Sequence, residues 1–438
     1  MKSFISKLRV LALLAISFVV ASYPWAVLSA ATAKVYEALT GPFLNPEGGR
    51  HSVNGALTLT NLIPTIYAAM DTVSREQTGF IRAVGRDSGA ERAAVGESVL
   101  SPVVGPMAAE NLNVGAYAAD TPAQTIGNVS MTISKARSVP FGITGEENKG
   151  LNNAGTLATI NRARIAQALR TLSNEVEDDL SALHVYASRA YGTATGTPFN
   201  TAADLSDFAN PLRILEENGA PTSDLHMVLD SASVGRIRSK QSSLFKVNEA
   251  GSEDLLRYGR LGSVQGIDLH WSPKVKQLVT VGACTATVDA TGYAVGATTL
   301  TLSAAACTLI VGDIVSFAGD SNQYVVAGGT LTSGGTLIIA EPGLKVAMSA
   351  ATKAITVVAA TTRNMFFYRG AIQLATRAPA MPDGGDCADD VMMITDPVSG
   401  ISYEFCLYRQ KRQIRYEVNL AWGVKAVQPR HIGLLIGA

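Results

Sequence analysis

The chain has 438 residues, a formal net charge of zero at pH 7, and 47% hydrophobic against 16% charged residues. This apolar content excludes a disordered chain and allows two or three folded domains. Because 36 basic and 36 acidic side chains balance, no long-range field draws the chain to nucleic acid, and any contact with DNA should be local and weak. The low charged fraction indicates a surface covered by neighbouring chains, or else a secreted or membrane-bound protein.

The N-terminus has the pattern of a secretory signal. Three basic residues precede an apolar run from Val10 to Val20, and residues 31–33 (Ala-Thr-Ala) fit a cleavage site. Pro24 interrupts the apolar segment, which is too short for a comfortable membrane span. Residues 1–55 are therefore predicted to be a signal-like or misannotated N-terminal extension. No later segment has eighteen consecutive apolar residues, so we expect no membrane partner.

The segment that follows changes from helical to extended character. Asn61 can cap a helix that has Pro64 in its first turn. Residues 80–150 then combine small residues, prolines and alternating stretches. We expect this segment to be a long extended β excursion and not a compact core.

The strongest helical pattern in the chain follows this excursion. Thr156 is a candidate N-cap and Gly192 a candidate C-terminal stop, which predicts a rod of roughly thirty residues and about 45 Å. Apolar residues at spacings of three and four predict one packing face along it. Its members are Ile165, Leu169, Leu172, Val176, Leu180 and Leu183. A rod of this length beside an extended arm suggests a scaffold element.

The C-terminal half predicts a mixed α+β region with a β domain inserted into it. Residues 201–279 mix helix and strand signals, whereas residues 280–360 are rich in Gly, Ala, Thr and Val and have short strands at roughly ten-residue spacing. That spacing predicts a small sandwich or barrel. Mixed character returns in residues 361–438, where residues 414–425 alternate strictly between apolar and more polar side chains. Such alternation predicts a long strand with one dry and one wetter face.

Catalytic and metal-binding patterns are missing from the sequence. It contains no phosphate loop, G-x-S-x-G or H-E-x-x-H, and the histidines and cysteines do not cluster, so we expect no enzyme, no cofactor and no metal site. Asp313 and Asp320 each follow a glycine, which favours two turns around a strand over a carboxylate pair or a calcium site. Free buried thiols are favoured over disulfides for the four cysteines. These are Cys284, Cys307, Cys387 and Cys406.

Two charge clusters remain to be explained. Acidic residues crowd the middle of the long helix, as either a solvated face or a surface that meets bases of another segment or subunit. The candidate source of bases is YRQKRQIR, where three basic residues are predicted to share one side of a strand, with Arg412 on the other. A wet sheet face, local ion pairs and contact with DNA stay open for this segment. The possible intersubunit charges are Glu175, Asp178, Asp179, Arg409, Lys411 and Arg415.

Five short segments, in order along the chain, resemble one protein family. They are residues 164–177 (RIAQALRTLSNEVE), 266–274 (GIDLHWSPK), 312–319 (GDIVSFAG), 364–374 (NMFFYRGAIQL) and 420–433 (LAWGVKAVQPRHIG). Each is similar to a segment of the major capsid (coat) proteins of short-tailed double-stranded DNA phages, of the P-twenty-two type with an insertion domain. With similar flanking regions, the resemblance covers about residues 56–438.

This resemblance implies an α+β fold of the Hong Kong 97 type and a virion protein that assembles in the host cytoplasm. It implies pentamers and hexamers that build an icosahedral procapsid around a scaffolding protein, with a portal and packaged double-stranded DNA as further partners. By position it divides the chain into an N-terminal arm, an extended loop, the spine helix of the peripheral domain, two peripheral and axial segments, and an inserted β-barrel. These correspond to residues 56–90, 91–150, 151–200, 201–279 with 361–438, and 280–360.

The signal-like N-terminus departs from that family, whose members carry no export signal. One explanation is a misread gene start, with translation beginning at Val53. The alternative is a different function, a secreted β-rich surface or adhesion protein, which the signal-like segment and the region rich in Thr, Gly and Ala favour.

Overall fold

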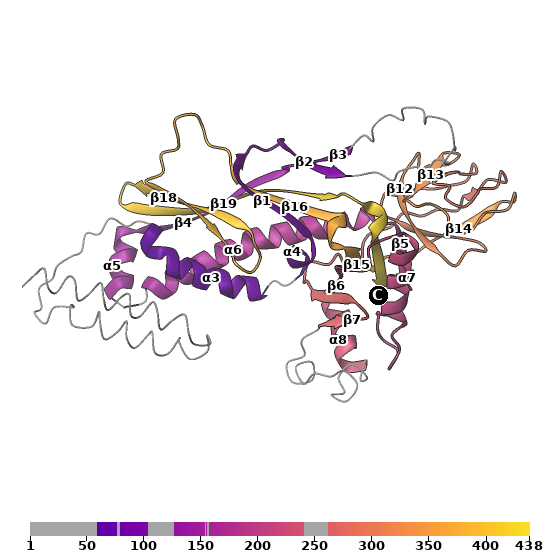
Figure 1. Ribbon diagram of the computed structural model, residues 1–438, viewed down its shortest axis with the longest axis horizontal. Coiled ribbons are helices and arrows are strands. Elements are labelled where there is room, and N and C mark those ends of the chain that lie inside the picture. The colour runs from indigo at the N-terminus through magenta and orange to yellow at the C-terminus, as the bar shows by residue number, and fades with distance from the viewer. Residues whose placement is uncertain (1–58, 77–78, 104–126, 154, 156, 241–261) are drawn as a thin grey trace, which may run out of the picture. The chain divides into compact units, whose positions relative to one another are not determined.

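A computed structural model describes residues 59–76, 79–103, 127–153, 155, 157–240 and 262–438 (Figure 1). The predicted signal-like extension at residues 1–55 lies outside these residues. Among the helices that the model describes, none has both the length and the apolar character that a bilayer span requires. The predicted mixed α+β class with one long helix is confirmed.

The described helices are mostly short, with α6 as the exception. The α-helices are α3 (Ile63–Glu76), α4 (Phe80–Ala83), α5 (Gly145–Asn153), α6 (Leu157–Ala182), α7 (Ser206–Glu217) and α8 (Ser231–Lys240). Single 3₁₀ turns are η2 (Leu59–Leu62), η3 (Leu183–Tyr186), η5 (Arg369–Ala371) and η6 (Pro429–His431).

Helix α6 is shorter than the sequence predicts. It has 26 residues, which corresponds to about 39 Å. The predicted stop at Gly192 is wrong, because the chain turns through η3 and then forms strand β5 (Arg189–Gly192). Gly192 has a φ of 123°, and a Cβ there would lie 2.2 Å from the carbonyl oxygen of Ile436. Close strand packing, and not helix termination, therefore requires this glycine.

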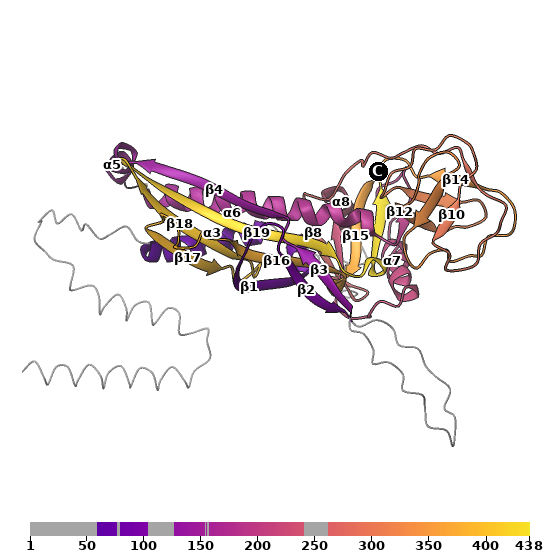
Figure 2. The ribbon, with the colours of Figure 1, turned by 90° about the horizontal axis from the view of Figure 1, so that it is seen from above.

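Strand β19 (Gln413–Ala426) is the central strand of a six-stranded sheet. Along one edge, β19 pairs with β4 over residues 413–422. Along the other edge, its first half pairs with β18 and its second half pairs with β16. Figure 2 shows α6 running alongside β4 and β19. The strands of this sheet are β1 (Gly85–Ala93), β4 (Lys135–Thr144), β16 (Ile372–Pro379), β17 (Asp390–Thr395), β18 (Ser402–Gln410) and β19. The alternating segment at 414–425 thus forms a strand, as predicted, and it pairs along both edges.

The expectation that residues 80–150 avoid the compact core is wrong for β1 and β4, which are strands of this sheet. Their partners, β16 and β19, lie more than 200 residues away in the sequence, so local alternation could not reveal the pairing. Only β2 (Ser98–Val103) and β3 (Gly127–Thr132) form a separate hairpin. Residues 104–126 between them lie outside the described part of the chain.

A second, twelve-stranded sheet continues from the mixed region into the inserted segment. In the mixed region its order is β7 (Ser263–Val264), β8 (Ile267–Trp271), β6 (Leu225–Leu229), β15 (Thr362–Tyr368), β20 (Ile432–Gly437) and β5. Strand β5 pairs with β12 of the inserted segment, so the two regions share one hydrogen-bonded sheet.

The inserted segment forms its own ring of strands. Successive pairings run from β12 through β11, β14 and β9, and from β12 through β13 to β10. An isolated bridge between Val288 and Leu302 closes the ring into a small barrel. Its buried side chains form a separate hydrophobic cluster. The strands are β9 (Thr287–Val288), β10 (Thr299–Thr301), β11 (Ile314–Phe317), β12 (Gln323–Gly328), β13 (Thr336–Ile339) and β14 (Lys353–Val357).

Two cysteines of the barrel correct the expectation of free thiols. Cys284 and Cys307 are disulfide-bonded. They lie opposite each other in an isolated antiparallel bridge, a pairing that their spacing in the sequence does not indicate. Cys406 is free and buried, as expected, whereas Cys387 is free and exposed.

The predicted wetter face of β19 is covered in its second half by the chain itself. Met131 on β3 and Ile133 directly after it pack there with Ala375 and Ala421. Gly423 follows Ala421 on the same face of the strand. A Cβ at Gly423 would lie 2.1 Å from the carbonyl oxygen of Thr132. This face is therefore not available to neighbouring chains at that point.

Replacing Gly423 by alanine is expected to destabilise the protein by about 1–3 kcal/mol, because backbone must shift to admit the methyl group. Urea unfolding of the full chain measures the change. Gly142→Ala on β4 is the matched control, since a Cβ there would meet nothing closer than 3.5 Å. Equal stabilities of the two variants would contradict the packing described here.

Candidate functional site

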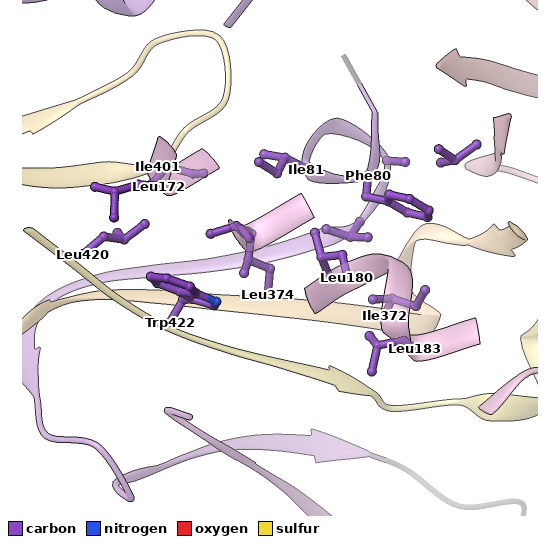
Figure 3. Close-up of a cluster of buried hydrophobic side chains, with 14 of the residues drawn as sticks. Phe80, Ile81, Leu172, Leu180, Leu183, Ile372, Leu374, Ile401, Leu420 and Trp422 are labelled. Carbon is purple, nitrogen blue, oxygen red and sulfur yellow. The ribbon is translucent and has the colours of Figure 1, made fainter. Parts of the chain in front are cut away.

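The apolar face of α6 lies between two layers of the core. All six residues predicted to form this face are buried, although Leu183 belongs to η3 and not to the helix. They share one hydrophobic cluster with α3 and α4 on one side and with the six-stranded sheet on the other. Figure 3 shows Leu172 and Leu180 among side chains of α4 and of the sheet, including Phe80, Leu420 and Trp422. The helix therefore joins the N-terminal helices to the C-terminal strands.

Glu177 on α6 is a buried connection that sequence reasoning missed. It is only 2% exposed. Its Oε1 accepts a hydrogen bond from the Ile81 amide at 2.8 Å, and its Oε2 accepts from the Phe80 amide at 3.0 Å and from the Ser272 hydroxyl at 2.7 Å. The carboxylate thus binds the free N–H groups at the start of α4. Burial raises the pKa of Glu177, and these hydrogen bonds oppose the rise.

Gly79 makes this arrangement sterically possible. A Cβ at Gly79 would lie 2.3 Å from the Ser272 Cβ and 2.6 Å from Glu177 Oε2. The start of α4 can therefore approach the carboxylate only with glycine at this position.

Asp179 connects the opposite side of α6 to the sheet. Its Oδ1 pairs with Lys135 Nζ at 2.7 Å, and its Oδ2 accepts a hydrogen bond from the indole N–H of Trp422 at 2.9 Å. Lys135 begins β4 and Trp422 lies on β19, so one carboxylate contacts both strands. A buried Trp commonly needs such a partner for its N–H.

The two remaining acids of α6 also have partners within the chain. Glu175 Oε2 lies 3.3 Å from Arg137 Nε, and Asp178 Oδ1 lies 2.8 Å from Lys276 Nζ. The structure does not bring these acids to the bases of YRQKRQIR, because strand β4 and the segment after β8 supply the nearer cations. Both pairs are substantially exposed, so each contributes little to stability.

The basic segment YRQKRQIR is a hairpin turn, and its prediction as one strand is wrong. Gln410 on β18 pairs with Gln413 on β19, which leaves Lys411 and Arg412 as a two-residue loop. Arg412 has a φ of 60°, the left-handed conformation that the second central residue of a type II turn adopts. Arg409, Lys411 and Arg415 therefore do not line one side of a strand, because strand periodicity ends at the turn.

Two of these bases have acidic partners nearby. Arg409 Nε lies 3.7 Å from Asp389, and Arg415 pairs with Glu417 at 2.6 Å. Lys411 forms no ion pair with another residue of the described ranges. Together with the start of α5, the turn borders a hollow of about 730 Å³. Intersubunit contact by these bases stays a prediction.

The two Gly-Asp pairs are turn carboxylates at the ends of β11. Asp313 Oδ2 accepts hydrogen bonds from the Ile310 amide at 2.8 Å and the Gly282 amide at 3.0 Å. Asp320 accepts from the Asn322 amide at 2.9 Å and from the Tyr324 hydroxyl at 2.6 Å. Among the residues with described positions, no three His, Cys, Asp or Glu side chains are grouped to hold a metal ion.

His184 on η3 makes the stability of this region depend on pH. The ring is 7% exposed, and its Nδ1–H donates to the Ser181 carbonyl at 3.1 Å. Burial, together with the positive charges of Arg363 and Lys276, lowers the pKa of His184 to about 4. The unfolded chain, with an ordinary histidine pKa near 6.5, binds the proton first. Stability is therefore present above about pH 6.5 and is lost as the pH falls toward 4.

His184→Asn keeps a donor for the Ser181 carbonyl but removes the titration. We expect it to reduce the loss of unfolding free energy between pH 6.5 and pH 4 by about 2–3 kcal/mol. Urea unfolding at several pH values measures this. His226 and His431, whose pKa values burial also lowers, supply a remaining dependence in both proteins. An identical pH profile for the variant and the unmodified chain would contradict the assignment.

Comparisons with known proteins give only distant structural likenesses. No family model and no curated protein matches the chain. Among solved structures, a chain of Mycobacterium phage Che8 is similar over 82% of this chain and 91% of its own, with 12% identity and a TM-score of 0.42. The capsid of cyanophage P-SCSP1u is similar over 83% and 89%, with 10% identity and a TM-score of 0.41. A virus-like particle from Pyrococcus furiosus is similar over 85% and 98%, with 7% identity and a TM-score of 0.40.

Proposed function

We propose that this chain is the major capsid protein of a double-stranded DNA phage, with a Hong Kong 97-type fold of the insertion-bearing P-twenty-two type. The observation that carries the proposal is where the five family-like segments lie. Residues 164–177 lie within α6, residues 364–374 include most of β15 and the start of β16, and residues 420–433 include the second half of β19 and the start of β20. These elements meet in one hydrophobic cluster around the long helix. The segments therefore belong to the structural core and not to scattered surface loops.

The other two segments also support the proposal. Residues 266–274 include β8 and end at Ser272 and Lys274, beside the Glu177 carboxylate. Residues 312–319 include β11 of the inserted barrel. Low overall charge suits a subunit that covers much of its surface with copies of itself. We further propose pentamers and hexamers around a scaffolding protein, with a portal and weakly bound DNA.

Particle formation tests this proposal directly. The chain is produced in bacterial cytoplasm with the scaffolding gene from the same genome, and the purified product is examined by sedimentation and electron microscopy. We expect rings or closed shells. A product that stays monomeric under all scaffolding ratios would reject the capsid function. The intact mass of the particle subunit also tests the proposed start at Val53.

One observation favours the second candidate, a secreted β-rich surface protein. The Cys284–Cys307 disulfide is typical of proteins from oxidising compartments. Acid quenching of cells, alkylation and mass spectrometry distinguish the two candidates. A capsid subunit in the cytoplasm should carry alkylated Cys284 and Cys307, whereas an exported protein should keep the bond and be recovered outside the cell. Exposed Cys387 is the internal control for alkylation.

A further inference from the structure

The joint between the inserted barrel and the core contains two buried arginines. Both Arg189 on β5 and Arg363 on β15 are 1% exposed. The joint is built by the pairing of β5 with β12, where Tyr324 lies opposite Arg189. It also includes Gly312, where a Cβ would lie 2.8 Å from the side chain of Val185 on η3.

Arg189 makes hydrogen bonds on both sides of this joint. Its Nη2 donates to Glu217 at 2.7 Å and also to Asn218 at 3.2 Å. Its Nη1 donates to Asn322 of the barrel at 3.3 Å. Both terminal nitrogens of this buried guanidinium are therefore paired, whereas its Nε has no hydrogen-bond partner among the described residues.

Arg363 differs, because its Nε, Nη1 and Nη2 have no hydrogen-bond partner among the described residues. Two further buried atoms are unpaired in the same way, Asp313 Oδ1 in the barrel and Thr361 Oγ1 at the end of the core strand. Burial lowers the pKa of Arg363 to about 10, and the negative charge of Asp313 acts against this. Buried polar groups rarely stay unsatisfied, because each such group costs free energy.

The chemistry of the unpaired atoms identifies what they bind. Arg363 supplies three donors, Asp313 a carboxylate acceptor, and Thr361 a hydroxyl group that can do both. Residues 276–282 run past all three, because the Lys276 carbonyl accepts from the Arg363 amide, the Val279 amide donates to the Thr361 carbonyl, and the Gly282 amide donates to Asp313 Oδ2. Water can accept from the guanidinium and donate to the carboxylate, as buried water commonly does. A second anion would be repelled by Asp313, and a cation would be repelled by Arg363.

We propose that Arg363, Asp313 and Thr361 form a hydrated polar site, in which ordered water links the core to the inserted barrel and holds the barrel in position. Asp313 suits this role because its other oxygen already binds the amides of Ile310 and Gly282. Lys276 and His184 are the other ionisable groups near Arg363. Lys276 pairs with Asp178, and His184 is neutral at pH 7. Asp313 is therefore the anion that faces Arg363. The proposal does not depend on whether the chain builds shells.

Hydrogen exchange of the full chain tests the site through amides that do not contact these side chains. The Val325 amide bonds to Ser188 across the joint, and the Val279 amide bonds to Thr361 at its base, where the chain enters and leaves the barrel. In Asp313→Asn and Arg363→Met we expect these two amides to exchange about tenfold faster, because the joint opens locally. Amides between β10 and β13 should keep their protection. Asp320→Asn, a turn carboxylate in the same barrel, should leave the joint amides unchanged.

The double variant Asp313→Asn/Arg363→Met adds a test of coupling. If water links the two charges, the double variant should accelerate joint exchange by less than the product of the two single effects. Multiplicative effects, or uniform acceleration throughout the chain, would overturn the proposal. A high-resolution map of the unmodified protein provides a test without variants. Density for water between Arg363 and Asp313 supports the site, and direct contact of their side chains rejects it.

Discussion

Leu172→Asp is expected to prevent folding of the subunit, and with it any assembly. Leu172 is completely buried in the cluster that α6 shares with Ile401, Leu420 and Trp422. An ionised carboxylate at this position has no cation within the cluster, so the change adds burial of an unpaired charge to the loss of an apolar side chain. The combined cost is expected to exceed about 5 kcal/mol, which is comparable to the whole stability of many domains.

Soluble yield and thermal unfolding monitored by circular dichroism measure this effect. Ala163→Asp is the matched control, because Ala163 is an exposed residue of the same helix. Leu172→Ala should have an intermediate effect of about 2–5 kcal/mol, since it leaves a cavity without adding charge. A soluble Leu172→Asp protein with unchanged unfolding would show that this face of α6 is wrongly assigned to the core.

Glu177→Gln is expected to destabilise the protein by about 2–4 kcal/mol, although it changes little in size. The carboxylate accepts three hydrogen bonds in a buried position. A glutamine side chain has only one acceptor oxygen, so its NH₂ group must face the donors of Phe80 and Ser272 or those of Ile81. The start of α4 should therefore detach from α6 more readily.

Urea unfolding gives the total change, and hydrogen exchange at Phe80 and Ile81 locates it. Glu175→Gln provides the control, because the same substitution two residues away removes an exposed ion pair with Arg137. That change should cost no more than about 1 kcal/mol. If the two variants were equally stable, Glu177 would not be the connection described above.

Helices and strands that show local periodicity could be predicted from the sequence. Pairings between distant segments could not. Spacings of three and four identified the buried face of α6, and strict alternation identified the strand at residues 414–425, because both patterns depend on neighbours in the chain. The pairing of β4 with β19 and of Cys284 with Cys307 depends on segments far apart in sequence. The end of α6 was misplaced because Gly192 meets a steric demand of β20.

The charged residues show the same limit. Four acids in the last third of α6 look alike in sequence, but the structure gives each a different environment. Glu177 is buried and binds backbone amides, Asp179 binds Trp422, and Glu175 and Asp178 form more exposed pairs. Their positions around the helix differ by 100° per residue, so tertiary neighbours determine which acid becomes structural.

The place of β19 in its sheet has a consequence for synthesis on the ribosome. β4, β16 and β18 are all translated before β19, yet each pairs with it. Until residues 413–426 emerge, the nascent polypeptide presents these strands with open edges. A prematurely terminated product that ends before residue 413 would therefore lack the strand that unites the sheet, and the edges of β4, β16 and β18 that face β19 would stay unpaired.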